Sequence, residues 1–139
     1  MKILMKLFMA LHVFFYHSSG GRMGGNMNGF KVLILNTVGR KSGKVHSNPV
    51  GYFEREGGYL VVASNGGQAN HPAWYHNLKA NPAFNIQVMD KVLPVQAGII
   101  TGDNRAKLWK SVVEEAPAFA NYEHSTTREI PLVLLRGTK

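Results

Sequence analysis

The stretch "TVGRKSGKVHSNP", residues 37–49, leads from one apolar segment, KVLILN at 31–36, into another, NPVGYFE at 48–54. Apolar segments of this length, separated by a polar stretch that contains glycine, predict two β-strands joined by a hairpin turn. Gly43 can supply the positive φ that a tight turn needs. The stretch therefore predicts the first hairpin of a β-rich fold.

The predicted turn is strongly basic and could bind an anion. It contains three cationic side chains and no acidic residue. Successive backbone N–H groups in such a turn can form an anion-binding concavity. Arg40 and Lys41 could pair with phosphate, and Ser42 could donate its hydroxyl. The spacing alone leaves open a solvated hairpin whose lysines only limit aggregation, but the residue order excludes a Walker A loop.

Composition places the basic charge in one part of a single domain. The chain has 139 residues, 45% of them hydrophobic, a formal net charge of +8 and no cysteine. Residues 1–53 carry seven Lys or Arg and no acid, whereas residues 54–139 carry nine bases and eight acids. This asymmetry favours a local anionic partner, either a phosphorylated cofactor, a membrane surface or nucleic acid. The absence of helix-turn-helix and RNP patterns argues against nucleic acid.

The N-terminal residues 1–18 are predicted to form an amphipathic helix. Apolar residues recur there at helical spacing, and the apolar run is shorter than the roughly 20 residues that span a bilayer. The helix could pack on the core, or residues 1–16 could also rest on a membrane surface. We expect a cytoplasmic protein, with or without such peripheral membrane association.

The remaining chain predicts a mainly β fold with flanking helices. Short apolar runs bounded by turn residues predict six strands, at 31–36, 48–54, 59–64, 84–89, 92–101 and 131–136. Helices are expected from Pro72 to Asn81, from 103 to 115 with Asp103 as its cap, and through Tyr122. Strands in hairpin order with few helices favour a small antiparallel barrel, with 1–139 as one domain.

Two further motifs combine small and aromatic residues. In SNGGQANHPAWYHNL, residues 64–78, Gly66 and Gly67 would let the backbone approach a flat ligand, although Trp74 and Leu78 could simply face the core. In APAFANYEHST, residues 116–126, a tyrosine hydroxyl could donate a proton to a substrate, or the ring could belong to the core. None of the six histidines has H-E-x-x-H spacing, so we expect no metal.

Together, TVGRKSG, NPVGY, VVASNGG and HPAWYHNLKANP resemble the deazaflavin-dependent nitroreductase family, which uses coenzyme F420. The likeness runs from about Phe14 to Leu135, with the motifs in the family's order. It implies a split β-barrel of about six strands, as in FMN-binding oxidoreductases. It also implies F420 as the cofactor, with FMN as the less favoured choice.

The resemblance assigns cofactor contacts residue by residue. The turn would contact the phosphate and acidic tail, the next strand the ribityl-like chain, and the two later segments the ring. In that order these residues are Arg40, Lys41 and Ser42; His46, Ser47, Asn48, Pro49, Val50, Gly51 and Tyr52; Val62, Ala63, Ser64 and Asn65; and Ala73, Trp74, Tyr75, His76 and Asn77. Tyr122 and Ser64 would be the catalytic proton donors, unless solvent takes that part.

The implied activity is hydride transfer from reduced F420 to a small electrophile, which could be a quinone, a nitro compound or an activated alkene. Nitroreductase-type members present several tyrosines where this chain has Ala116, Phe119 and Tyr122, so only one hydroxyl is kept. This loss leaves open a non-catalytic carrier of F420 or flavin with the same fold. The expected partners are a small-molecule substrate and no nucleic acid, with the chain acting as a monomer or homodimer.

Overall fold

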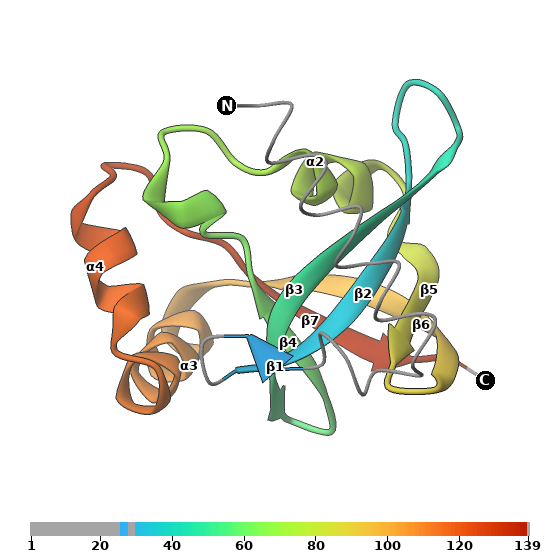
Figure 1. Ribbon diagram of the computed structural model, residues 1–139. Coiled ribbons are helices and arrows are strands. Elements are labelled where there is room, and N and C mark those ends of the chain that lie inside the picture. The colour runs from blue at the N-terminus through green and yellow to red at the C-terminus, as the bar shows by residue number, and fades with distance from the viewer. Residues whose placement is uncertain (1–25, 28–29, 139) are drawn as a thin grey trace.

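The computed structural model describes residues 26–27 and 30–138 and is dominated by one antiparallel sheet (Figure 1). The helix expected over residues 1–18, and the membrane contact expected of it, lie outside the described residues. The strands are β1 (Asn26–Met27), β2 (Phe30–Val38), β3 (Val45–Arg55), β4 (Gly58–Val62), β5 (Ala83–Val88), β6 (Lys91–Ile100) and β7 (Leu132–Gly137).

The sheet closes on itself to form a barrel. Its strand order is β1-β2-β3-β4-β7-β6-β5, and an additional pairing joins β2 to β5. The closing register aligns Leu35 with Ile86 and Asn36 with Asn85. Six strands thus form a closed antiparallel barrel, to which β1 adds a short ladder on β2. The predicted mainly β fold with a six-stranded barrel and flanking helices is confirmed.

The barrel interior is apolar, and a short helix packs on one end of it. Inward residues such as Leu33, Leu35 and Ile86 are completely buried. The helix α2 (Ala73–Ala80) adds Trp74, Tyr75 and Leu78 to the same core cluster. Leu78 is 1% exposed, which shows that this helix is held by core packing rather than by its own eight residues.

A second apolar cluster lies between the outer face of the sheet and two helices. The helices α3 (Gly102–Glu115) and α4 (Ala118–His124) pack there, with Trp109, Val112 and Phe119 against Leu60 and Leu132. Figure 1 shows α3 and α4 together on one side of the barrel, away from the projecting β2–β3 hairpin. The two clusters fix opposite faces of β4 and β7.

Several local predictions are corrected in detail. Strands β2 and β3 extend further toward their hairpin than expected, because the polar residues up to Val38 and from Val45 still pair. The strand β1 and the 3-10 turn η1 (Asn65–Gly67) were not predicted. Thr101, not Asp103, is the N-cap residue of α3, and no side-chain capping bond forms there.

Candidate active site

The β2–β3 turn is a tight loop closed by two backbone hydrogen bonds. The Gly39 N–H donates to the Lys44 carbonyl over 2.7 Å, and the Gly43 N–H donates to the Gly39 carbonyl over 3.0 Å. Gly43 has φ 71°, as its place in the turn predicted. The Lys44 N–H donates to Ser42 Oγ at 3.2 Å. Residues 39–44 are hereafter called the hairpin corner.

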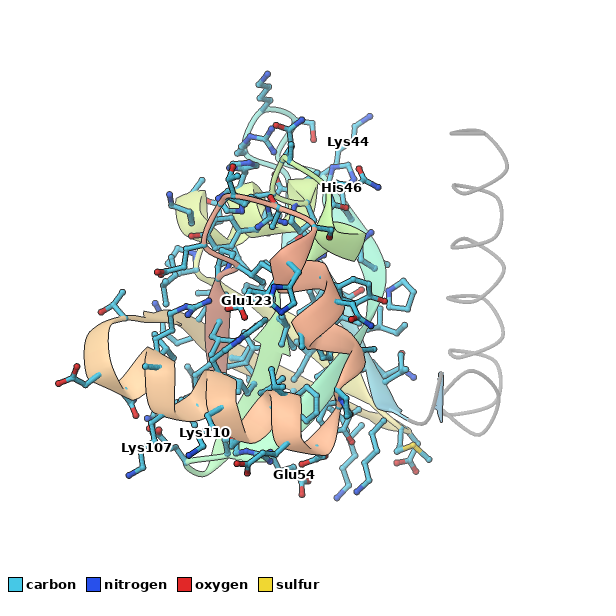
Figure 2. The ribbon with its side chains drawn as sticks, turned by 90° about the vertical axis from the view of Figure 1, so that its left-hand side faces the viewer. Lys44, His46, Glu54, Lys107, Lys110 and Glu123 are labelled. Atoms are coloured by element: carbon cyan, nitrogen blue, oxygen red, sulfur yellow. The ribbon has the colours of Figure 1, made fainter. Side chains whose placement is uncertain are left out.

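The cations of the hairpin corner are exposed and have no acidic partner among the residues that the structure describes. Arg40, Lys41 and Lys44 are all exposed. The ion pairs found among residues 30–138 involve Arg55, Arg105 and Arg136, and none includes a corner residue. In Figure 2, Lys44 and His46 lie together at one extremity of the molecule. The positive charge inferred from the sequence is thus concentrated and uncompensated at this turn.

The hairpin corner is bonded directly to helix α2. Both the backbone N–H and the Nη1 of Arg40 donate to Asn77 Oδ1, at 3.2 and 2.9 Å. One turn further, Asn81 Nδ2 donates to the Val38 carbonyl at 3.3 Å. Asn77 is buried although it is polar, and these bonds explain why that burial is tolerated. The corner and helix α2 therefore lie side by side.

A small polar cradle lies over Gly39. A Cβ at this position would fall 2.6 Å from Ser42 Oγ and 2.8 Å from His46 Nε2. The absence of a side chain thus lets a hydroxyl and an imidazole converge over the buried backbone of Gly39. Both groups can donate hydrogen bonds, which suits a phosphate oxygen. Arg40, Lys41 and Ser42 therefore present donors that suit an anionic ligand group.

Thr37 adds an unmet hydrogen-bonding group at the base of the corner. Its side chain is completely buried, and its Oγ1 has no partner among the described residues. A buried hydroxyl left unpaired costs about 1–3 kcal/mol. Sequence reasoning missed Thr37, because a threonine near a strand end is ordinary and only burial shows that its hydroxyl is unpaired.

The predicted contact strand 46–52 divides between two faces. His46, Asn48, Val50 and Tyr52 share the face of Thr37 and Leu35, because directly paired residues point the same way. Ser47, Pro49 and Gly51 point to the other face, where Ser47 Oγ donates to Asn36 Oδ1 at 2.6 Å. The period of two means that side chains of only one set can reach a ligand on a given face.

The predicted ring-bordering residues 62–65 end strand β4 and enter η1. Val62, Ala63 and Ser64 are buried and Asn65 is half-buried. Asn65, Gly66 and Gly67 have φ values of 49°, 64° and 79°, so three residues in a row are left-handed. This conformation turns the chain sharply after Ser64, and it is the reason for the paired glycines.

Gly67 makes the closest contact between this turn and helix α4. A Cβ there would lie 2.1 Å from Ser125 Oγ and 3.2 Å from the Cα of Tyr122. The proposed catalytic residues Ser64 and Tyr122 thus flank the same turn. Tyr122 is half-buried and stacks edge-on with Phe119 at 5.6 Å between ring centres. Phe119 is buried against Phe53, so it is a core residue.

Residues 73–77 differ in what they can offer a ligand. Trp74 and Tyr75 are mostly buried in the barrel core, at 8% and 6% exposed, whereas Ala73 is exposed and His76 is half-buried. Burial raises the pKa of Tyr75. The core alternative for Trp74 and Leu78 is confirmed, and only the exposed edge of this segment remains for contacts with a ligand.

Sequence reasoning also missed Arg128, which lies between α4 and β7. Its guanidinium donates to three carbonyls: Ala63 at 3.2 Å, Ser64 at 2.6 Å and Gln68 at 3.0 Å. It also lies 2.8 Å from His71 Nδ1. No motif surrounds Arg128, so only the folded chain shows that it bonds to the Ser64 turn.

A separate hollow lies near the base of the hairpin. It has a volume of about 550 Å³ and is lined by ends of β2, β5 and β6, including Val38, Phe84 and Val95. None of the residues predicted to contact the cofactor lines it. Within the described residues, no three His, Asp or Glu side chains gather as a metal site, and no helix is long and apolar enough to cross a membrane.

The site thus combines a closed barrel with a basic corner that is bonded to helix α2. The sequence profile of the F420H2-dependent quinone reductase family matches residues 8–137. The chain therefore belongs to the F420H2-dependent quinone reductase family. It is an oxidoreductase whose cofactor is coenzyme F420. The F420-dependent class inferred from the motifs is confirmed, while the family name is corrected from nitroreductase to quinone reductase.

Relatives and solved structures agree with this assignment. An F420H2-dependent quinone reductase of Mycobacterium tuberculosis is 38% identical over 129 residues, covering 90% of this chain and 87% of the relative. An F420-H2 dependent reductase structure, FDR-A, is 42% identical with TM-score 0.68, covering 76% of this chain and 93% of that one. A structure described as a domain-swapped dimer is 35% identical with TM-score 0.72, covering 91% and 93%.

Proposed function

We propose that this reductase passes a hydride from F420H2 to a quinone, and that its substrate site lies where the hairpin corner, α2 and η1 meet. The observation that carries this proposal is the pair of hydrogen bonds that Arg40 donates to Asn77 Oδ1. It puts the uncompensated cations next to the segment 73–77 that would cover the ring. The name shared by the family and the Mycobacterium tuberculosis relative supports a quinone as the acceptor.

The hairpin corner would hold the anionic end of the cofactor. Arg40 and Lys41 would pair with phosphate and carboxylate oxygens, and Ser42 and His46 would donate from the cradle over Gly39. Charge-assisted hydrogen bonds are worth about 1.5–3 kcal/mol each, so two or three suffice to retain the tail.

The Ser64 turn and the edge of α2 would hold the ring. Val62, Ala63, Ser64 and Asn65 would border it, Ala73 to Asn77 would cover it, and inward residues of β3 would line the chain between ring and tail. When bound, reduced F420 supplies a hydride from C5 of its deazaflavin ring. The protein must hold the acceptor within about 3–3.5 Å of that carbon and exclude bulk water.

Tyr122 and Ser64 would deliver the proton that follows the hydride. Both flank the η1 turn, and Tyr122 is half-buried, so its hydroxyl can remain accessible while its ring is held by Phe119. A quinone accepts the proton on a carbonyl oxygen that becomes negative. The loss of two tyrosines found in nitroreductase-type members is consistent with a substrate that needs fewer donors.

The test is oxidation of F420H2 by the purified protein, followed at the absorbance of oxidised F420. We expect turnover with a soluble naphthoquinone and slower or no turnover with a nitroaromatic compound or an activated alkene. Tyr122→Phe and Ser64→Ala should lower kcat and leave F420 affinity close to wild type. A protein that binds F420 but reduces the nitroaromatic compound faster than the quinone would contradict the proposed substrate.

We also propose that the chain acts as a homodimer. The support is the 35% identical relative described as a domain-swapped dimer, which covers 91% of this chain. Light scattering on the purified protein, with and without F420, gives the mass directly. A mass of about 15 kDa in both samples would contradict the dimer.

A further inference from the structure

One arginine side chain bonds to both ends of the Ser64 turn from the outside. Arg128 donates through Nε to the Gln68 carbonyl, through Nη1 to Ala63 and through Nη2 to Ser64. These carbonyls lie on both sides of η1, so the guanidinium ties together the entry and exit of the turn. Arginine suits this task because its planar fork presents several donors in a fixed geometry, which lysine lacks.

The same guanidinium fixes the hydrogen-bonding state of His71. Arg128 Nη1 lies 2.8 Å from His71 Nδ1. Because a guanidinium can only donate, Nδ1 must accept, so the neutral imidazole carries its proton on Nε2. His71 in turn packs on Tyr75 at 4.7 Å and His76 at 5.7 Å between ring centres. Arg128 thereby reaches the start of α2 as well as the Ser64 turn.

We propose that Arg128 is a positioning residue of this reductase: it orders the turn that borders the deazaflavin ring and holds His71 as the neutral Nε2–H tautomer. The part that concerns the ring rests on the function proposed above. The part that concerns His71 does not depend on it, because it follows from contacts within the protein. Arg128 itself is not proposed to touch the reacting atoms.

The electrostatic surroundings of His71 agree with this assignment. Burial, followed by the charge of Arg128, lowers the pKa of His71 below its usual 6.5. His76 and Lys79, both on α2, lower that pKa further, so every charged neighbour that acts on His71 opposes its protonation. Burial also lowers the pKa of Arg128, but a guanidinium remains charged at neutral pH.

The first experiment is an NMR titration of the imidazole nitrogens in the cofactor-free protein, with His71 assigned through His71→Gln. We expect the Nε2–H tautomer and a pKa below 6.5 in the wild type. Arg128→Gln should raise that pKa and populate the Nδ1–H form. The control Arg136→Gln removes an exposed arginine that bonds to the Glu56 carbonyl, and it should change neither quantity.

The second experiment is F420 binding by Arg128→Lys, which keeps the charge but loses the fork. We expect affinity to fall about 10-fold or more, while the His71 pKa stays low. If Arg128→Gln does not fold, the His71 tautomer of the wild type and the F420 affinity of Arg128→Lys still test the proposal. An Nδ1–H wild type, an unchanged His71 in Arg128→Gln, or wild-type F420 affinity in Arg128→Lys would overturn the proposal. A wild-type protein that binds no F420 refutes the proposed cofactor site and leaves the His71 result standing.

Discussion

Two consecutive hairpins of the same barrel differ in whether the cations at them have acidic partners. At the β3–β4 hairpin, Arg55 pairs with Glu115 at 2.8 Å and Arg136 pairs with Glu56 at 3.7 Å. At the β2–β3 hairpin, three exposed cations have no acidic partner among the described residues. Figure 2 shows that Glu54, beside the β3–β4 turn, and Lys44, in the β2–β3 turn, lie at opposite ends of the molecule.

This difference separates a structural charge from a functional one. Both hairpins need only a turn and a ladder to form, so the fold itself does not require unbalanced charge at either. At the β3–β4 hairpin, Arg55 of β3 and Arg136 of β7 each have an acidic partner within the chain. The β2–β3 cations repel one another, and a polyanionic ligand, as we propose, would make this arrangement favourable.

The largest expected effect comes from removing the corner charges. Arg40→Ala combined with Lys41→Ala should weaken F420 binding more than about 10-fold, because at least one charge-assisted bond is lost. The matched control, Arg55→Gln with Arg136→Gln, removes the same charge from the neighbourhood of the β3–β4 hairpin, where Arg55 of β3 and Arg136 of β7 form ion pairs. Fluorescence titration of F420 compares the two. Equal losses in both variants would show that net charge, and not the corner, governs binding.

A second comparison contrasts the neighbouring glycines of η1. Gly67→Ala combines positive φ with a Cβ only 2.1 Å from Ser125 Oγ, whereas Gly66→Ala meets nothing within 4 Å. Left-handed strain costs about 1–2 kcal/mol at either position, and the clash adds to it at Gly67 alone. The free energy of unfolding measured in urea should therefore be clearly lower for Gly67→Ala than for Gly66→Ala. The reverse order would contradict the close packing of η1 on α4.

The two faces of β3 provide a third and smaller test. His46 lies beside the cradle over Gly39, whereas Ser47 bonds to Asn36 on the other face. His46→Ala should weaken F420 binding several-fold, since one donor is lost, about 0.5–1.5 kcal/mol. Ser47→Ala should bind like the wild type in the same titration. A loss at Ser47 and none at His46 would place the cofactor on the outer face.

The smallest effect is the pH dependence contributed by His71. Its pKa in the folded protein is lower than the unfolded value of 6.5, so the unfolded state takes up the proton first. The contribution of His71 to the free energy of unfolding should be fully present above pH 6.5. It should be lost as the pH falls through 6.5 toward the folded pKa. His71→Gln should lose less stability over that interval in urea titrations at several pH values. An identical pH dependence in both proteins would show that His71 does not contribute to the pH dependence of stability.

The fold could be predicted from sequence because its signals are local. Apolar runs separated by turn residues gave all six barrel strands, and Gly43 marked the hairpin correctly. The boundaries were less certain, since polar residues such as Thr37 and His46 continue the β2–β3 ladder without any apolar pattern. The closing β2–β5 pair joins residues some fifty positions apart, and no local signal specifies it.

The site was predictable only in part for a related reason. Motif resemblance indicated the corner and the Ser64 turn, which are contiguous segments. It could not reveal that Trp74 and Tyr75 are mostly buried in the core, or that Ser47 faces away from His46. Arg128 and Thr37 became visible only through contacts and burial, because neither stands in a recognisable pattern.

The central claim, that the hairpin corner recognises the anionic end of F420, is tested most directly by comparing two ligands. The affinity of F420 and of its phosphate-free deazaflavin chromophore is measured by fluorescence for the wild type and for Arg40→Ala with Lys41→Ala. We predict that the wild type prefers F420 by more than about 10-fold and that the double variant loses most of this preference. An equal preference in the two proteins would contradict the claim.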